Sequence, residues 1–240
     1  MKGLILAAGK GSRLRPLTYA MPKALISIRG RPLITYPILS LKDTGIKDIG
    51  IVIREKDYPK FKSNLKFPGL KINYIFQKKP NGSARAIECA HNFVGNNTFL
   101  LCWCDFLSPF KFKKLIKEHL RFNPSATILI NKEKNPSGTA QVLYKGRYIT
   151  RIEEKPIKRF SYWGSTGSLV LKPLIFSALS KIIPSAKGEY NIADALQYLV
   201  EQGQRVRFLK IDTWRININR PRDLKLARAK ILSCLDNWGL

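Results

Sequence analysis

"LILAAGKGSRLRPLTYAMPKAL", residues 4–25, begins as a short apolar run and changes within one residue into a loop that contains Gly9 and Gly11. The basic residues Arg13 and Lys23 follow the two glycines. Glycine lets backbone N–H groups approach an anion closely, and arginine and lysine side chains neutralise its charge. Open α/β sheets bind ligands beyond the carboxyl ends of their strands, so the stretch predicts a buried strand that ends in a phosphate-binding loop.

This loop matches neither of two common phosphate-binding motifs. In a Walker loop the lysine precedes Ser or Thr, whereas Lys10 precedes Gly11 here. In the dinucleotide-binding fingerprint a third glycine stands where this chain has Leu14. A glycine-rich turn by itself is more often a tight connection than a site, so its assignment depends on the motifs that accompany it.

Short apolar runs alternate with segments of helical period along the chain. We expect strands near 3–8, 48–53, 71–76, 98–104 and 126–131, with helices at 32–44, 57–65, 83–93 and 110–121 between them. Further strands are expected near 140–144, 148–152, 166–172 and 205–211, with helices near 173–181, 190–202 and from about Pro221. This alternation is typical of an α/β fold with a mostly parallel sheet flanked by helices.

Length and composition favour one compact domain. The chain has 240 residues with 45% hydrophobic content, enough for one core or for two halves that share a sheet, and no linker or internal repeat divides it. No apolar run reaches the roughly 18 residues of a membrane span, and no secretory cleavage site is present, so we expect a cytoplasmic protein without a membrane span. The four cysteines predict reduced core thiols without a chemical role.

The charge balance is strongly basic, with 43 Lys and Arg against 16 Asp and Glu and a formal net charge of +27. Such an excess attracts polyanions over long range, so nucleic acid, an anionic membrane surface or phosphorylated substrates are candidate partners. A basic surface that binds polyanions without specificity, or that has no partner at all, explains the charge equally well. The basic residues are spread along the whole chain, so no separate arm concentrates them.

The string "LAAGKGSRLRPLT" (residues 6–18), followed by "PKAL" (residues 22–25), resembles the signature of the sugar-1-phosphate nucleotidyltransferases. The nearest types are glucose-1-phosphate thymidylyltransferases and UTP-sugar pyrophosphorylases. In that family the glycine loop and its arginine hold the nucleotide triphosphate, and the lysine of the second string also reaches the phosphates. The resemblance therefore implies catalytic roles for Arg13 and Lys23, and nucleotide binding by Leu6, Ala8, Gly9 and Gly11.

"YIFQKKPNGSARAIECA" (residues 74–90) resembles the family pattern Q-x-x-P-x-G-x-A. The resemblance places Gln77 and Gly82 at the nucleotide, and the glutamine usually reads the base. An amide offers a donor and an acceptor side by side, which suits the adjacent N3–H and O4 of uracil or thymine. We therefore expect UTP or dTTP as the nucleotide.

"LLCWCDFLSPF" (residues 100–110) resembles the segment that carries the family's metal-binding aspartate, which is Asp105 here. An aspartate that ends so apolar a run must be solvated, paired or metal-bound to stay ionised. In "WRININRPRDL" (residues 214–224), Asn217 stands where many members have a second metal-binding aspartate. Its carbonyl oxygen is also a hard ligand, so the resemblance implies a Mg²⁺ cofactor held by Asp105 and Asn217.

Three strings resemble the family's sugar-phosphate motifs. "ITRIEEKP" (residues 149–156) matches I-x-E-K-P, in which Glu154 would contact the sugar and Lys155 its phosphate as a catalytic residue. "NPSGTAQV" (residues 135–142) and "TGSLVL" (residues 166–171) would bring three more residues to the sugar, Gly138, Thr166 and Gly167.

The resemblance implies the Rossmann-like, mixed and mostly parallel sheet of nucleotide-diphospho-sugar transferases. It also implies one catalytic domain over residues 1–240, with a nucleotide-binding half at about 1–131 and a sugar-phosphate half at about 132–240. The expected reaction is magnesium-dependent transfer of a nucleotidyl group from a nucleoside triphosphate to a sugar-1-phosphate, with release of pyrophosphate.

Two alternatives remain open from the sequence. The chain could be a non-catalytic or weakly active binding or regulatory module of the same fold, which associates with RNA or another polyanion through its basic surface. It could also be a peripheral membrane protein. The last predicted helix has Leu224, Ile231 and Leu235 on one apolar face, which favours docking on the chain's own core.

Overall fold

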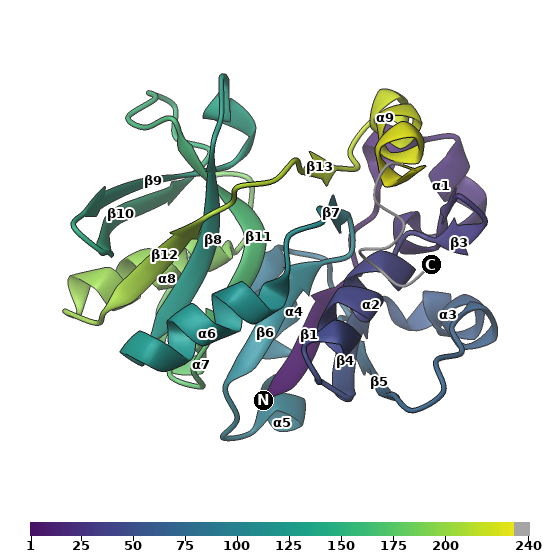
Figure 1. Cartoon of the computed structure of the whole chain (residues 1–240), viewed down its shortest axis with the longest axis horizontal. Coiled ribbons are helices and arrows are strands. Elements are labelled where there is room, and N and C mark those ends of the chain that lie inside the picture. Colours follow the sequence, from purple (N-terminus) through teal and green to yellow (C-terminus); the bar gives the residue numbers. More distant parts are fainter. Residues whose placement is uncertain (233–240) are drawn as a thin grey trace.

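A nine-stranded mixed sheet runs through the computed structural model, which describes residues 1–232 (Figure 1). In spatial order its strands are β5 (Lys71–Phe76), β4 (Asp48–Ile53), β1 (Lys2–Leu6), β6 (Phe99–Trp103), β11 (Trp163–Leu171), β8 (Ala126–Lys132), β12 (Val206–Lys210), β10 (Tyr148–Glu154) and β9 (Ala140–Lys145). The pairings make seven of these strands run in one direction and β10 and β11 in the other. The prediction of a mixed, mostly parallel sheet is confirmed.

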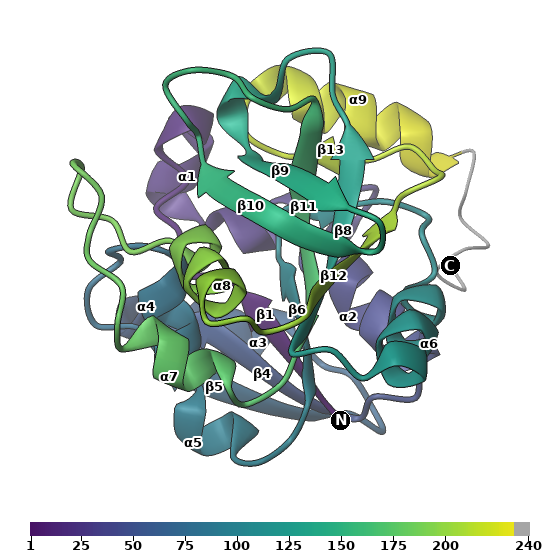
Figure 2. The same cartoon turned by 90° about the vertical axis from the view of Figure 1, so that its left-hand side faces the viewer.

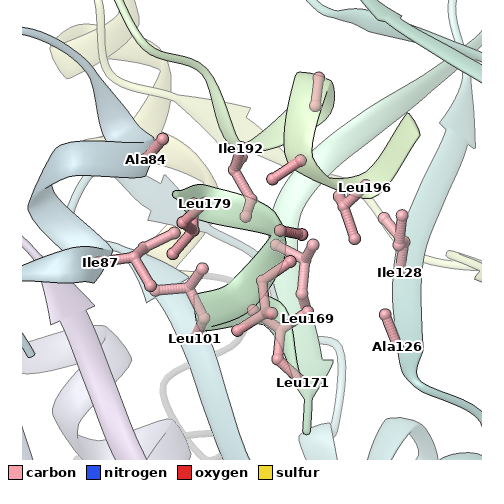
Figure 3. Packing of buried hydrophobic residues seen from close by; sticks show 14 of the residues in the cluster. Ala84, Ile87, Leu101, Ala126, Ile128, Leu169, Leu171, Leu179, Ile192 and Leu196 are labelled. Carbon is pink, nitrogen blue, oxygen red and sulfur yellow. The ribbon is translucent and has the colours of Figure 1, made fainter. Parts of the chain in front are cut away.

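The central strands are apolar along their length because helices cover both faces of the sheet. On one face, α4 (Ser83–Glu88), α7 (Ile175–Leu179) and α8 (Ile192–Glu201) pack on the strands, and Figure 3 shows Ile87, Leu179 and Leu196 meeting Leu101 and Leu169. On the other face, α2 (Thr35–Asp43), α3 (Tyr58–Asn64) and α6 (Phe112–Phe122) contribute to a second core. Figure 2 shows α7 and α8 on one side of the strands and α2 and α6 on the other.

Short elements that the sequence pattern did not reveal surround the main sheet. They are α1 (Leu17–Ala20), the pair β2 (Ser27–Ile28) and β3 (Arg31–Pro32), and the pair β7 (Phe106–Leu107) and β13 (Ile216–Asn217). The single helix expected over 83–93 is two helices, α4 and α5 (His91–Val94), because the chain turns between them at Cys89 and Ala90. The β7–β13 pair matters most, since it joins the two halves of the chain above the sheet (Figure 1).

The last helix, α9 (Pro221–Leu232), packs on its own chain as expected. Leu224 and Ile231 are buried in a third core beneath the short β2–β3 and β7–β13 pairs, whereas Leu235 lies outside the described residues. Within residues 1–232 no helix has both the length and the apolar character needed to cross a membrane.

The cysteine prediction is confirmed for two residues and wrong for a third. Cys102 and Cys104 are buried free thiols, but Cys89 is exposed at the end of α4; Cys234 lies outside the described residues. Burial raises the pKa of Cys104 to about 12, and the neighbouring Asp105 carboxylate adds to this effect. Cys104 therefore remains a neutral thiol at physiological pH.

Candidate functional site

A cavity of about 470 Å³ opens at the carboxyl ends of β1 and β6. It gathers most of the residues that the sequence motifs single out: Leu6, Ala8, Gly9, Gly11, Arg13, Lys23, Gln77, Gly82, Asp105 and Lys155. Four cationic side chains line it, against the two carboxylates of Asp105 and Glu189. The electrostatics of the cavity therefore favour an anionic ligand.

The glycine loop is fixed where β1 ends. Its first residue, Ala7, donates its N–H to the carbonyl of Val52 at 2.8 Å, and the Leu6 carbonyl accepts from Cys104 N–H at 3.1 Å. Gly11 has a φ of 62°, and a Cβ there would lie 3.1 Å from the Cβ of Lys23. A Cβ at Gly9 would meet no atom within 4 Å, so its position faces open space that a ligand can enter.

Lys23 and Asp105 form the charged centre of the cavity. The Lys23 ammonium donates to Asp105 Oδ2 at 2.5 Å, and the two side chains are only 12% and 16% exposed. The sequence predicted that an aspartate after so apolar a strand would need solvent, a partner or a metal ion, and Lys23 is that partner.

Asn219 completes this centre, and the sequence motifs did not identify it. Its Oδ1 accepts from Arg13 Nη2 at 2.9 Å and lies 3.5 Å from Lys23 Nζ. The position is set by the β7–β13 pair, after which Ile218 N–H donates to the Asp105 carbonyl at 3.0 Å. Asn219 therefore lies beside Asp105 although the two are far apart in the sequence.

The helix start after Asn219 holds this residue in place. Asp223 Oδ2 accepts from the backbone N–H groups of Asn219 and Arg220 at 2.8 and 2.7 Å, and Pro221 occupies the first position of α9. An acidic residue three positions into a helix commonly accepts from the N-cap backbone in this way, and proline is common at the first position. The string "RPRD" was the sequence signal for this helix start.

Asn217 occupies a different environment from the one the sequence predicted. It pairs with Phe106 in the β7–β13 ladder, and its Oδ1 accepts from Arg215 Nη1 at 3.2 Å. Arg215 also bonds Asn131 Oδ1 at 2.7 Å and pairs with Glu133. Asn217 is not among the residues that line the cavity, and Asn219 takes the place beside Asp105.

Gln77 lines the same cavity and is almost fully buried. Its N–H donates to the Ile53 carbonyl at 2.9 Å, and its Nε2 donates to the Gly82 carbonyl at 3.3 Å. This hydrogen bond fixes the orientation of the amide, so the Gln77 side-chain oxygen and the second Nε2 hydrogen form an adjacent acceptor and donor.

Gly82 permits a close crossing of two distant segments. It has a φ of 119°, and a Cβ there would lie 2.2 Å from the carbonyl oxygen of Tyr190. The crossing is held by hydrogen bonds from Ala84 N–H to Tyr190 O at 3.0 Å and from Tyr190 N–H to Asn81 O at 2.9 Å. It brings Glu189 and Asn191, neither of which we had assigned to the nucleotide, to the cavity rim.

The sugar-phosphate residues divide into two groups. Lys155 lines the cavity, with its ammonium 2.7 Å from Glu154 Oε1 and its side chain 54% exposed. Four others lie outside the cavity wall: Gly138, Glu154, Thr166 and Gly167. Thr166 is buried and donates to the Leu129 carbonyl at 2.9 Å. A Cβ at Gly167 would lie 3.1 Å from Trp103, so this glycine makes room for the Trp103 ring that lines the cavity.

A wider cavity of about 700 Å³ adjoins the first at Asn191, which lines both. Glu154 and Asp194 lie on its wall. Burial raises the pKa of Asp194, hydrogen bonds from Asn191 oppose this shift, and the charge of Glu154 adds to it. The carboxylates of Glu154 and Asp194 therefore line one cavity, which shares Asn191 with the cavity at the glycine loop.

The described residues contain no group of three or more His, Cys, Asp and Glu that could hold a metal ion. The donor set at Asp105 and Asn219 consists of one carboxylate and one amide oxygen. Mg²⁺ is usually bound by one or two carboxylates together with substrate phosphates and water, so these residues fit a magnesium ion that arrives with a nucleotide.

Comparison with known proteins identifies the family of this chain. The family model of the nucleotidyl transferases matches residues 2–216. The chain therefore belongs to the nucleotidyl transferase family, and the resemblance seen in the motifs is confirmed.

Among its relatives, the low-salt glycan biosynthesis nucleotidyltransferase Agl11 of Haloferax volcanii is 32% identical over 97% of this chain and 66% of its own length. The UTP–glucose-1-phosphate uridylyltransferase AglF of the same organism is 29% identical over 96% of both chains. A glucose-1-phosphate thymidylyltransferase of Streptomyces griseus is 31% identical over 86% of this chain and 59% of its own length. The chain thus spans less than two thirds of the length of Agl11 and of the Streptomyces enzyme.

Solved structures share the fold. A Bacillus anthracis protein described as a glucose-1-phosphate thymidylyltransferase, solved with sucrose, superposes with a TM-score of 0.88 at 28% identity and covers 96% of this chain and 94% of its own. A UDP-glucose pyrophosphorylase complexed with UDP-glucose superposes with a TM-score of 0.86 at 22% identity, covering 97% and 98% of the two chains.

Proposed function

We propose that this protein transfers a nucleotidyl group from UTP or dTTP to a sugar-1-phosphate, with magnesium as cofactor. The observation that carries the proposal is the cluster of Lys23, Asp105 and Asn219 directly beneath the glycine loop. Relatives named as glucose-1-phosphate uridylyltransferase and thymidylyltransferase support the same reaction class. Residues 1–131 would bind the nucleotide and residues 132–240 the sugar phosphate.

The reaction needs no side-chain nucleophile. An oxygen of the sugar phosphate forms a bond to the α-phosphorus of the nucleotide, the bond from that phosphorus to the bridging oxygen breaks, and pyrophosphate leaves with the electron pair. The attacking oxygen is already anionic, so no proton has to be removed. Catalysis then consists of positioning two anions and neutralising their charge. Positioning alone is worth roughly 7–11 kcal/mol in favourable intramolecular models.

The chain's own residues supply these two effects. Backbone N–H groups of the glycine loop and the Arg13 guanidinium would hold the triphosphate. The Lys23 ammonium would leave the Asp105 carboxylate and donate to a phosphate oxygen of the nucleotide instead. Lys155, on the opposite wall, would hold the phosphate of the sugar. A magnesium ion held by Asp105 and Asn219 would supply charge neutralisation at the α-phosphate.

Gln77 supports the choice of nucleotide. Its buried amide, oriented by the Gly82 carbonyl, matches the donor and acceptor of uracil or thymine. A base that does not bring a donor and an acceptor to this amide would leave a buried polar group unpaired, which costs about 1–3 kcal/mol, or roughly ten- to a hundredfold in preference. Equal turnover of GTP would contradict this assignment.

A substrate panel tests the proposal. Purified protein with Mg²⁺ is offered each of the common nucleoside triphosphates with several sugar-1-phosphates, and pyrophosphate release is measured. We expect turnover with UTP or dTTP and at least one sugar-1-phosphate. Absence of turnover with every pair would instead support a non-catalytic binding module of the same fold.

A further inference from the structure

A cavity of about 460 Å³, termed the second cavity, shares Lys10 with the cavity at the glycine loop, which is the proposed nucleotide cavity. Its wall comes from the segment after β1, from the segment after β4, and from Lys60 of α3. β1 and β4 are parallel neighbours with Leu6 opposite Val52, so the segments that follow them leave the sheet at the same edge (Figure 1). The strand order therefore builds this cavity directly beside the nucleotide site.

The lining of this second cavity is strongly cationic. It contains five basic side chains, Lys10, Arg15, Arg54, Lys56 and Lys60, and one carboxylate, Asp57. Arg54 Nε donates to Asp57 Oδ2 at 2.6 Å, so this pair is neutral overall. Within residues 1–232 none of the other four cations forms an ion pair with a carboxylate. Gathering these four like charges costs free energy that a bound anion would recover.

Other contacts hold some of these groups in place without neutralising them. The Lys60 ammonium donates to the Ala20 carbonyl at 2.5 Å, which ties α3 to the end of α1. The Arg15 guanidinium lies over the Tyr19 ring, 5.1 Å from its centroid. Asp57 is buried and fixes Arg54 at the inner wall. An anion that enters would meet donors that are already positioned, which lowers the entropic cost of binding.

We propose that this second cavity binds free pyrophosphate, at a site separate from the nucleotide site. Lys10 lines both cavities, so a small polyanion that leaves the glycine loop on this side meets the second cavity next. Pyrophosphate is compact and highly charged, which suits a small cavity lined by four cations that have no carboxylate partner within residues 1–232. The choice of pyrophosphate as the ligand rests on the proposed function, because that reaction releases pyrophosphate. The proposal of an anion site rests only on the lining residues.

Sharing Lys10 links the two sites. An anion in the second cavity attracts the Lys10 ammonium and weakens its attraction for a triphosphate on the glycine loop. Pyrophosphate bound there would therefore lower the affinity for the nucleotide without occupying the nucleotide cavity. The expected result in steady-state assays is mixed, rather than purely competitive, product inhibition.

Equilibrium dialysis with radiolabelled pyrophosphate tests the proposal on the whole chain. A non-hydrolysable UTP analogue at saturation fills the nucleotide cavity, and the pyrophosphate still bound is counted. The lining variant Lys56→Ala/Lys60→Ala is compared with Lys62→Ala/Lys66→Ala, which removes the same charge from exposed lysines nearby that do not line the cavity. We expect the lining variant to lose at least about tenfold in affinity and the control less than about threefold.

Several outcomes would overturn the proposal: displacement of all pyrophosphate by the analogue, an equal loss in both double variants, or mixed-sequence RNA that binds through Lys56 and Lys60 where pyrophosphate does not. The single variant Lys56→Glu, checked for its fold by circular dichroism, changes the charge by the same two units at one position and should weaken binding by at least about tenfold as well. Dialysis requires no turnover, so a failed substrate panel would remove the proposed function and leave this measurement readable.

Discussion

The ammonium nitrogen of Lys23 lies 2.5 Å from a carboxylate oxygen of Asp105, across the carboxyl ends of two neighbouring strands. The lysine comes from the segment after β1 and the aspartate from the end of β6. Each side chain is mostly buried and would be costly to ionise alone. Together they form an ion pair. Under the proposed function, the ammonium would bind a phosphate of the nucleotide and the carboxylate would bind a metal ion.

Replacing Asp105 with Asn should remove catalysis and leave nucleotide binding. The variant keeps the shape of the side chain but loses its charge, and we expect turnover to fall by about 10²–10³-fold, as when one electrostatic contact to a transition state is removed. Pyrophosphate release gives the rate, and calorimetric titration gives the nucleotide affinity. The matched control is Asp212→Asn, which removes an exposed carboxylate paired only with Lys114. Near-native turnover of the Asp105 variant would remove the proposed metal site.

Asn219 and Asn217 can be distinguished by adding a carboxylate at each position. Unit charges 4 Å apart attract by about 1 kcal/mol in water, and a divalent ion doubles this, so Asn219→Asp should lower the magnesium concentration for half-maximal turnover about tenfold or more. Asn217→Asp should leave it unchanged, because that side chain lies beside Arg215 and outside the cavity. A magnesium titration measures this concentration for both variants. A lower concentration in Asn217→Asp than in Asn219→Asp would instead support Asn217 as the metal ligand.

Gly82→Ala should destabilise the whole protein. The new Cβ would lie 2.2 Å from the Tyr190 carbonyl oxygen, in a backbone conformation with a φ of 119°. We expect the free energy of unfolding to fall by about 3 kcal/mol or more, because both segments must separate. Urea denaturation measures the change. Gly138→Ala is the control, since a Cβ there meets nothing within 4 Å and should alter stability by no more than about 0.5 kcal/mol.

His119 should make the fold sensitive to acid. It is buried, its Nδ1 lies 2.9 Å from Thr127 Oγ1, and burial lowers its pKa to about 4, with a smaller contribution from Lys172. The unfolded chain protonates this histidine near pH 6.5, so its contribution to stability is present above that pH and is lost as the pH falls toward 4. The full loss is about 3 kcal/mol.

The variant His119→Gln tests this contribution, because glutamine carries no titratable group. Denaturation at pH 7.5 and 4.5 should show a smaller loss of stability on acidification in the variant than in the parent. The difference between the two proteins isolates the histidine from the carboxylates, which titrate in both. An equal loss in both would mean that His119 does not carry the effect.

The main strands were predictable because helices cover the sheet on both sides. β4 and β5 begin and end where apolar periodicity placed them, at 48–53 and 71–76. The pair β7–β13 was not predictable, because each strand is two residues long and its partner lies in the other half of the chain. Only the tertiary fold brings these two segments together.

The gathering of the motif residues Arg13, Gln77 and Asp105 at one cavity was predictable because they follow strands of one sheet. Gln77 and Asp105 lie within two residues of a strand end, and Arg13 lies seven residues after β1, so sequence order places them at one edge of the sheet. The position of Asn219 at the cavity was not predicted, because counting back from Pro221 along the motif leads to Asn217. The hydrogen bond from Ile218 to Asp105, which no sequence pattern reports, determines which of the two asparagines reaches the cavity.

The β7–β13 pair also determines when the site can form during synthesis of the chain. The ribosome adds the glycine loop, Lys23 and Asp105 long before the segment 216–219, so β1 and β6 can pair before Asn219 has been synthesised. A nascent chain that stops short of β13 would hold a paired lysine and aspartate with no asparagine beside them. The cluster of Lys23, Asp105 and Asn219 is therefore complete only after residues 216–219 have been synthesised.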